Sequence, residues 1–413
     1  MMKRAAEMPE ELIPTLRNNL QLLLMEEDGQ RFVLMNDNHG YAEDEIAVSI
    51  EFYNLLISLG GKTKYSDLGE KLKINDLMIL NQILQNIKDL DEMGFLNSSS
   101  FKIKKSQIDQ GYFELVDRPY VCAQNSYPED VGELNNFLAQ IFNSTNSESS
   151  KSNSSAIIVP HIDLKLSDIC SKIYSSGYHS ARETDFDLLV VLGTAHYDSS
   201  DLLMPTKKNY KTPLGTAKTD TDILELWESH LGDKLPYNDL AHKPEHSIEY
   251  QILLSQYYFI NRNFTVLPIL VGSFGEFVYY NSVPESSEDF RKLISSLKLA
   301  IEESGRKALF IASVDFAHIG RKFGDDYDAE PILDSLKNED KILIDALTNL
   351  DKHRFFRKIS EDNDKYRICG TSPIYSLMSL KDFKRCEFLD YAQWNETQTK
   401  SAVSFASLAL FDD

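Results

Sequence analysis

The sequence has little of what marks secreted or membrane proteins. Only four of its 413 residues are cysteine, which is too few and too scattered for a disulfide framework. No apolar run approaches the roughly 20 residues that a membrane-spanning helix requires. No apolar stretch follows the basic pair Lys3-Arg4, so we expect no secretory signal. These absences favour a reduced, cytoplasmic protein with no membrane partner.

Basic residues are also scarce relative to acidic ones. Lys plus Arg number 43 and Asp plus Glu number 64, which gives a formal net charge of −21. Such a surface repels a phosphate backbone, so we expect no general nucleic-acid binding. The hydrophobic fraction of 42% is that of a folded globular chain and excludes a disordered one. At about 150 residues per domain, the length predicts two or three domains.

Several enzyme signatures are missing too. The chain contains no Gly-x-x-x-x-Gly-Lys phosphate loop, no Gly-x-Gly-x-x-Gly, no Gly-x-Ser-x-Gly and no Cys-x-x-Cys. These absences weigh against nucleotide-dependent enzymes, α/β-hydrolases and zinc ribbons.

The first section of the chain has mostly helical periodicity after one early hairpin. Asp28-Gly29 is a turn signal between two apolar runs, and Gly60-Gly61 is a usual helix stop. The pattern resembles a winged-helix unit and, with its hairpin, the small PqqD-like peptide-binding modules. A helical accessory domain without a ligand is the alternative. The expected elements are strands over residues 20–25 and 31–35 and helices over residues 43–59, 66–72 and 76–90.

From Ala156 onward the pattern is that of an α/β domain. Short, β-branched, continuously apolar runs predict strands that are buried on both faces, and amphipathic helices such as residues 290–303 separate them. The polar tract over residues 143–155 predicts a flexible surface loop. The expected strands cover residues 156–159, 187–192, 264–270 and 308–312.

Polar side chains directly follow three of these strands. His161 follows the first, His196 the second, and Asp315 and His318 follow the last. In open α/β sheets, ligands bind beyond the carboxyl ends of the strands. A single histidine in such a place is more often a hydrogen-bonded loop residue, but three strands that deliver His or Asp to one edge predict a shared pocket.

His242 and His246 have the spacing of a zinc-binding pair, but Pro244 between them suits the first turn of a helix. We therefore expect a helix from about Glu245. On this helix His246 and Glu249 lie three residues apart, which suits an acid/base pair and equally a cap on a solvated face.

Cys369 opens a further predicted helix, whose N-terminus stabilises a thiolate as a nucleophile or metal ligand. A lone cysteine is more often a small buried hydrophobic residue, and we assign Cys122, Cys170 and Cys386 to that class.

Seven ordered segments together have the pattern of a known family. They are Ala156-Ile157-Ile158-Val159-Pro160-His161, Leu192-Gly193-Thr194-Ala195-His196, Lys211-Thr212-Pro213-Leu214-Gly215, Glu245-His246-Ser247-Ile248-Glu249, Ser313-Val314-Asp315-Phe316-Ala317-His318, Ile368-Cys369-Gly370 and Tyr391-Ala392-Gln393. From about Pro119 to Leu410 the chain resembles the Memo family, whose bacterial and archaeal members are called AmmeMemoRadiSam system protein B. This family is similar in fold to class III extradiol dioxygenases, which hold non-haem iron.

The resemblance implies both a domain division and a site. It places an accessory domain over residues 1–114 and a three-layer Memo-like α/β domain over residues 115–413, with the tract over 143–155 as a disordered loop inside the second. Behind His161 and after Gly370 the chain departs from the animal members, so the edge of the pocket differs. The positions that match the family's metal site are His161, His196 and Cys369, and those that match its pocket lining are His246, Asp315 and His318.

Three functions are compatible with these residues. The first is an oxidoreductase with Fe²⁺ or, as second choice, copper on the three ligands. In it His246 or His318 would be the general base for an unknown small-molecule substrate, oriented by Glu249 or Asp315.

The second function is a binding or assembly protein that carries a metal or small ligand. The name of the family's system implies a radical-SAM protein and an AMMECR-type protein as its partners, and a PqqD-like unit suits that role. The third function makes Cys369 a covalent nucleophile with His161 or His196 as its base.

Overall fold

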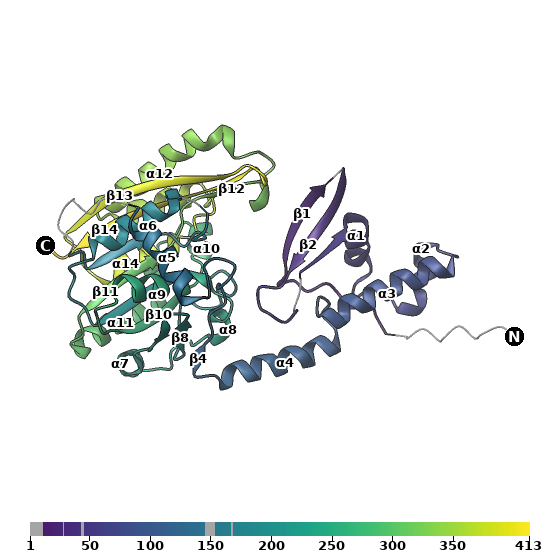
Figure 1. The fold of residues 1–413 in the computed structure, drawn as a ribbon, viewed down its shortest axis with the longest axis horizontal. Helices are drawn as coiled ribbons and strands as arrows, with labels where there is room; N and C mark the ends of the chain where they lie inside the picture. Colours follow the sequence, from purple (N-terminus) through teal and green to yellow (C-terminus); the bar gives the residue numbers. More distant parts are fainter. Residues whose placement is uncertain (1–10, 28, 43–44, 145–152, 167) are drawn as a thin grey trace. The chain divides into compact units, whose positions relative to one another are not determined.

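The chain forms two compact units, Met1–Leu115 and Val116–Asp413, which Figure 1 draws in sequence colours. The central part of the loop predicted over residues 143–155 lies outside the described residues. Among the described helices, none combines the length and the apolar character that crossing a bilayer demands. The computed structural model describes residues 11–27, 29–42, 45–144, 153–166 and 168–413.

Over its described residues, the first unit joins a small antiparallel sheet to four helices. Its elements are β1 (Gln21–Glu27), β2 (Gln30–Asn36), β3 (Ile46–Ser49), α1 (Ile50–Leu59), α2 (Leu68–Leu72), α3 (Leu77–Met93) and α4 (Ser99–Glu114). Strand β2 lies between β1 and β3, and its apolar side chains pack with those of α1 and α3. Arg17 and Asp37 form a buried ion pair at 2.9 Å beside this core.

The helix predicted over residues 43–59 is wrong in its first part. Residues Ile46–Ser49 form β3, which pairs with β2, because the apolar residues at Ile46 and Val48 alternate and sheet pairing outweighs helix propensity there. The Ser49 hydroxyl then accepts the N–H of Phe52 and caps α1, which ends at Leu59 as predicted. Helix α4 follows a serine cap as well but was not predicted.

The second unit is built on an eight-stranded sheet, and the α/β fold with a small N-terminal sheet domain is confirmed. The strands run in the order β12-β14-β5-β11-β6-β10-β7, and β13 pairs with β14. The four strands β5, β11, β6 and β10 are mutually parallel. The strands are β5 (Ala156–Val159), β6 (Leu188–Thr194), β7 (Leu203–Pro205), β10 (Thr265–Val271), β11 (Ala308–Ser313), β12 (His318–Gly320), β13 (Arg385–Glu396) and β14 (Ser401–Phe411).

Helices cover both faces of this sheet, so the unit has three layers (Figure 1). One face packs against α5 (Val131–Phe142), α6 (Asp168–Ser180) and α9 (His246–Tyr258). The opposite face packs against α7 (Thr221–Leu231), α11 (Glu288–Ser304), α12 (Leu333–Thr348), α13 (Lys352–Glu361) and α14 (Thr371–Leu380). A small second sheet holds β4 (Asp117–Arg118), β8 (Asn209–Thr212) and β9 (Gly215–Ala217), and the short helices are α8 (Asp239–His242) and α10 (Gly275–Tyr279).

The parallel strands form as predicted because their residues are buried on both faces. All four residues of β5 are buried, and so are six of the seven in β10. Because β5, β11, β6 and β10 are neighbours and parallel, their carboxyl ends meet at one edge. The segments that follow these strands are therefore brought together.

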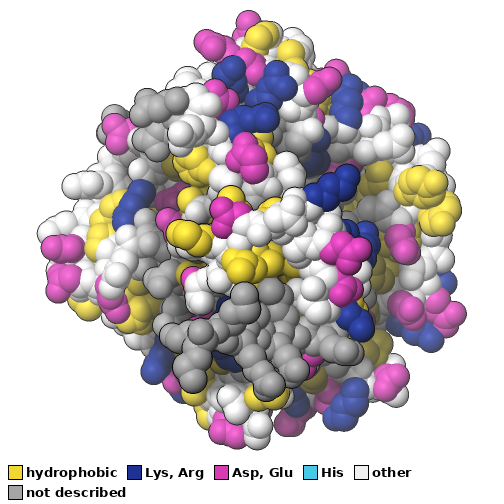
Figure 2. Space-filling model, turned by 90° about the vertical axis from the view of Figure 1, so that its right-hand side faces the viewer, with side chains coloured by type: hydrophobic (Ala, Val, Ile, Leu, Met, Phe, Trp, Pro, Cys, Tyr) yellow, Lys and Arg dark blue, Asp and Glu magenta, His cyan; other side chains and the backbone are white. Residues whose placement is uncertain are grey.

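The surface carries both signs of charge. On the face drawn in Figure 2, Asp and Glu side chains are interspersed with Lys, Arg and apolar side chains.

Gly177 tests how closely α6 packs on the sheet. A Cβ atom at this position would lie 2.3 Å from Cγ1 of Val159 on β5, so Gly177→Ala should lower the free energy of unfolding by about 1–3 kcal/mol. In the control Gly111→Ala, the new methyl group meets nothing within 4 Å, and the helix should gain about 0.5–1 kcal/mol. Urea denaturation of both variants checks this, and equal stability of the two would contradict the packing argument.

Candidate metal centre

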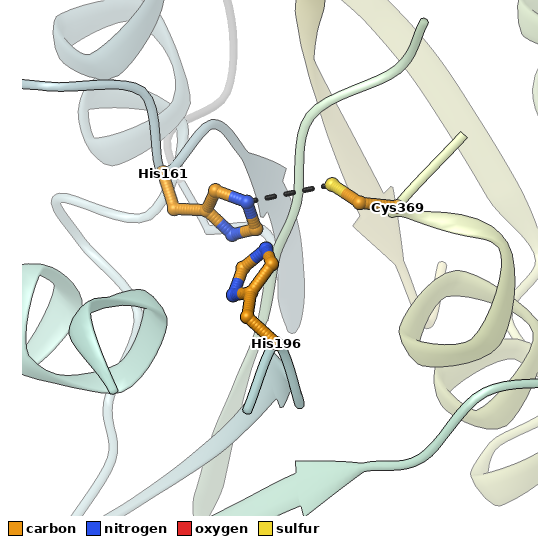
Figure 3. A group of neighbouring side chains, drawn as sticks. All are labelled: His161, His196 and Cys369. Atoms are coloured by element: carbon orange, nitrogen blue, oxygen red, sulfur yellow. Dashed lines mark hydrogen bonds between the residues drawn. The ribbon is translucent and has the colours of Figure 1, made fainter. Parts of the chain in front are cut away.

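The three predicted metal ligands converge at the carboxyl-end edge of the sheet. His161 lies two residues beyond β5 and His196 two residues beyond β6, and β11 separates these strands in the sheet. Cys369 directly precedes Gly370, the N-cap of α14. Figure 3 shows the two imidazole rings and the thiol gathered around a common space.

The distances are short enough for one ion to contact all three residues. One potential ligand atom from each of His161, His196 and Cys369 lies within 4.8 Å of the other two. The Sγ atom of Cys369 is 3.4 Å from Nε2 of His161, and the two imidazole centroids are 4.9 Å apart. His246 lies beside them, with its ring centroid 5.1 Å from that of His161, and forms a second group of possible ligands with His196 and Glu245.

Hydrogen bonds fix which ring nitrogen of each histidine faces this space. Nδ1 of His161 lies 2.9 Å from the carbonyl oxygen of Ser313, and Nδ1 of His196 lies 3.0 Å from a carboxylate oxygen of Glu245. Both partners accept hydrogen bonds, so in the neutral form of each ring Nδ1 carries the proton and Nε2 keeps its lone pair. Metal-binding histidines are oriented in the same way, by a carbonyl or carboxylate on the other nitrogen.

Burial and neighbouring charges set the protonation of the histidine cluster, which consists of His161, His196 and His246. Burial, together with the nearby rings of His196 and His246, holds the pKa of His161 well below its usual value. Burial alone would lower the pKa of His196, but the charge of Glu245 outweighs it and raises that pKa. Burial opposes ionisation of Glu245, yet the two histidines that contact it hold its pKa well below the usual range. Glu245 is thus an ionised carboxylate with no exposed surface.

The thiol of Cys369 is not activated by the helix it precedes. Burial, reinforced by the charge of Asp315, raises its pKa well above the usual value, although Sγ accepts the N–H of Asp315 at 3.2 Å. The predicted stabilisation of a thiolate by α14 is therefore outweighed. Without a cation beside it, Cys369 is a poor nucleophile near neutral pH.

Asp315 and His318 lie close to the cluster but do not form a pair. Asp315 accepts the N–H of His161 at 3.1 Å, and its other oxygen lies 3.6 Å from His161 Nε2. Burial raises the pKa of Asp315 to about 7. Nδ1 of His318 faces the carbonyl oxygens of Phe316 and Arg367, and burial lowers its pKa to about 4. Backbone carbonyls, not the predicted Asp315, orient His318.

The predicted pairing of His246 with Glu249 is wrong. Glu249 has no exposed surface and binds Arg118, Tyr127 and two backbone N–H groups. The carboxylate beside His246 is Glu245, at 3.2 Å from Nδ1. Glu245 was not among the predicted site residues, although its place directly before His246 and at the start of the predicted helix was a usable signal. His242 lies outside the cluster, with its ring nitrogens on Tyr210 and the Met204 carbonyl.

Comparison with known protein families now adds to this geometry. The family model described as Memo-like protein matches residues 118–409, well over half of the chain. The chain belongs to the Memo-like family.

Relatives of this Memo-like chain come from bacteria, archaea and animals. A MEMO1 family protein of Aquifex aeolicus is 30% identical over 93% of this chain and 96% of its own length. A MEMO1 family protein of Methanosarcina mazei is 29% identical, over 71% of this chain and 98% of its own. Protein MEMO1 of Rattus norvegicus is 26% identical, over 69% of this chain and 93% of its own length. The Aquifex match covers more than the second unit, so it extends into the first.

A buried arginine at the start of the Memo-like region holds the backbone beside the histidine cluster in place. Arg118, on β4, has no exposed surface, and its Nη1 lies 2.5 Å from a carboxylate oxygen of Glu249. Nε donates to the carbonyl of His242 and Nη2 to the carbonyl of Glu245, both at 2.6 Å. Arg118 therefore fixes the first turn of α9, from which Glu245 and His246 reach the cluster.

The Memo-like cluster opens on a cleft of about 550 Å³, a volume typical of small-ligand sites. His196 and Cys369 form part of its wall. The segment after β10, helix α10, the residues before Cys369 and the first residues of α14 complete it.

The substitution Arg118→Met tests how much the contacts of Arg118 with the start of α9 contribute to stability. The change leaves the Glu249 carboxylate buried without its cation, so the free energy of unfolding should fall by about 3–5 kcal/mol. In the control Lys298→Met, the exposed pair with Asp382 is lost, and stability should change by less than about 1 kcal/mol. Chemical denaturation of both variants measures the difference. Equal losses in the two variants would show that the buried network contributes nothing special.

Proposed function

We propose that this Memo-like protein binds one redox-active metal ion, with Fe²⁺ preferred and copper as the second choice, on His161, His196 and Cys369. The observation that supports the proposal is the convergence of the three donors within 4.8 Å, with each imidazole turned so that Nε2 is the available nitrogen. The Ser313 carbonyl and the Glu245 carboxylate then act as the outer contacts that such ligands need.

The donor set suits these metals. Imidazole binds iron and copper, and a thiolate adds negative charge and favours softer ions. A bound ion would lower the pKa of the Cys369 thiol, which burial raises in its absence. Iron or copper at this place would supply electron transfer and Lewis acidity.

The residues around the donors have separate tasks in this proposal. His246 and His318 both keep an acceptor on Nδ1, so Nε2 of either ring is the nitrogen that can take a proton from a small-molecule substrate. Glu245 holds the proton of His246 at Nδ1, and the Arg367 carbonyl does the same for His318. Burial favours the neutral form of His318, as a base requires. Asp315 positions His161 through its backbone N–H.

A non-enzymatic role uses the same donors. In this second candidate function the protein carries a metal or small ligand for a radical-SAM protein and an AMMECR-type protein, and the first unit contacts one of them. The match to the Aquifex relative, which extends into the first unit, favours a shared task for that unit. Turnover with a consumed oxidant would distinguish the oxidoreductase from this carrier.

Elemental analysis tests the metal site directly. We expect wild-type protein, purified anaerobically without a metal-binding tag, to hold close to one equivalent of iron or copper. His161→Ala and Cys369→Ser should lose most of it, because each removes a donor. Cys386→Ala, at a buried cysteine on β13, is the matched control and should keep its metal. Full occupancy in Cys369→Ser would refute the ligand assignment, and zinc in place of iron or copper would refute the redox role.

Glu245→Gln separates ligand orientation from ligation. The amide keeps the shape of the side chain but loses the charge that fixes the proton on Nδ1 of His196 and His246, so metal affinity should fall about 10–100-fold. Competition with a chelator measures the dissociation constant. Glu276→Gln, at an exposed position on α10, should leave it unchanged. Wild-type affinity in Glu245→Gln would remove this carboxylate from the site.

A further inference from the structure

The lining of the cleft beside the metal ligands combines apolar and polar residues. Phe274, Val278 and Tyr279 form an apolar part, named here the Phe274–Tyr279 wall, and His196 and Cys369 belong to the polar part. Tyr279 is 76% exposed, whereas Phe274 is buried. The exposed ring of Tyr279 therefore gives a substrate with an apolar or aromatic body a surface to lie on, and the polar group of that substrate needs a partner in the lining.

Arg367 is that partner. Among the described residues that line the cleft it is the one lysine or arginine, and 39% of its side chain is exposed. Its Nε donates to the carbonyl of His318 at 3.0 Å, and Nη2 pairs with the carboxylate of Asp325. These contacts fix the plane of the guanidinium and engage its Nε–Nη2 edge, and the side chain stays partly exposed in a residue that lines the cleft. A fixed guanidinium loses little freedom when it binds a second planar anion.

The backbone around Arg367 is held in an unfavourable conformation. Asn363, Asp364 and Arg367 have φ values of 51°, 49° and 51°, in the left-handed region that costs free energy for residues other than glycine. All three line the cleft. Asp364 directs one carboxylate oxygen to the N–H of Ile368 at 2.8 Å, so it is tied into the same loop. Strain of this kind persists where the surrounding contacts hold a functional group in place.

We propose that Arg367 binds the carboxylate of a small organic acid whose body lies on the Phe274–Tyr279 wall, and that this acid is the substrate class of the site. This inference deepens the proposed function and rests on it, because the bound acid is a substrate only if the metal site is catalytic. A guanidinium fork matches a carboxylate in shape and charge. The carbonyl of Arg367 also accepts the Nδ1–H of His318 at 3.0 Å, so the residue that binds the acid also orients a candidate base.

Binding of benzoate to the metal-free, full-length chain tests the proposal, with neutral benzamide as the matched probe. By isothermal titration calorimetry, wild-type protein should bind benzoate at least about tenfold more tightly than benzamide, as expected for a hydrogen bond to a charged group. Arg367→Gln should lose that preference. Arg367→Lys, which keeps the charge but not the fork, should keep part of it.

Arg321→Gln is the control, because Arg321 pairs with Asp328 and does not line the cleft, and it should retain the full preference. Equal affinity of wild-type protein for the two probes, no measurable benzoate binding, or a preference that persists in Arg367→Gln would each overturn the proposal. Circular dichroism of Arg367→Gln guards against a folding defect. Because the titration uses no metal, failure of the proposed metal site would not change the benzoate result. Failure of benzoate binding would likewise leave the metal analysis unchanged.

Discussion

The geometry of the site depends on one buried carboxylate. Glu245 has no exposed surface, yet the contacts with His196 and His246 keep it ionised. Its side chain also accepts the N–H of His196 and caps α9 at Ser247. A charge buried this deeply is stable only when every oxygen has a partner. The carboxylate therefore fixes two imidazole rings, one strand end and one helix start relative to each other.

The same helix carries a second buried glutamate with a different task. Glu249 is one turn further along α9 and binds Arg118, which also holds the Glu245 carbonyl. One glutamate faces the histidine cluster and the other faces the interior. Arg118 connects them across the first turn of the helix. The hydrogen bonds of Arg118, Glu245 and Glu249 thus hold the side chains of the histidine cluster in position, although these residues lie up to 131 residues apart in the chain.

Some site residues could be predicted from the sequence and others could not, and the difference lies in the local pattern around each residue. His161, His196 and Asp315 follow apolar strands, so the edge they occupy was predictable. The error at Glu249 has a physical cause: Ser247 to Ser255 on α9 are all buried, so the helix has no polar face from which its orientation could be read. Strand β14 escaped prediction for a related reason, since its 11 buried residues include the small polar Ser401, Ser404 and Ser407.

The sequence by itself determined the parallel strands and the edge at which their polar residues meet, because these depend on local hydrophobicity and on residue type. It also carries, at His161, His196 and Cys369, the positions that match a family's metal site. The tertiary structure decided which glutamate orients the histidines, that Arg118 supports them, that burial keeps the Cys369 thiol protonated and that Arg367 faces the cleft. Each of these depends on contacts between distant segments, and such contacts leave no periodicity or spacing in the chain.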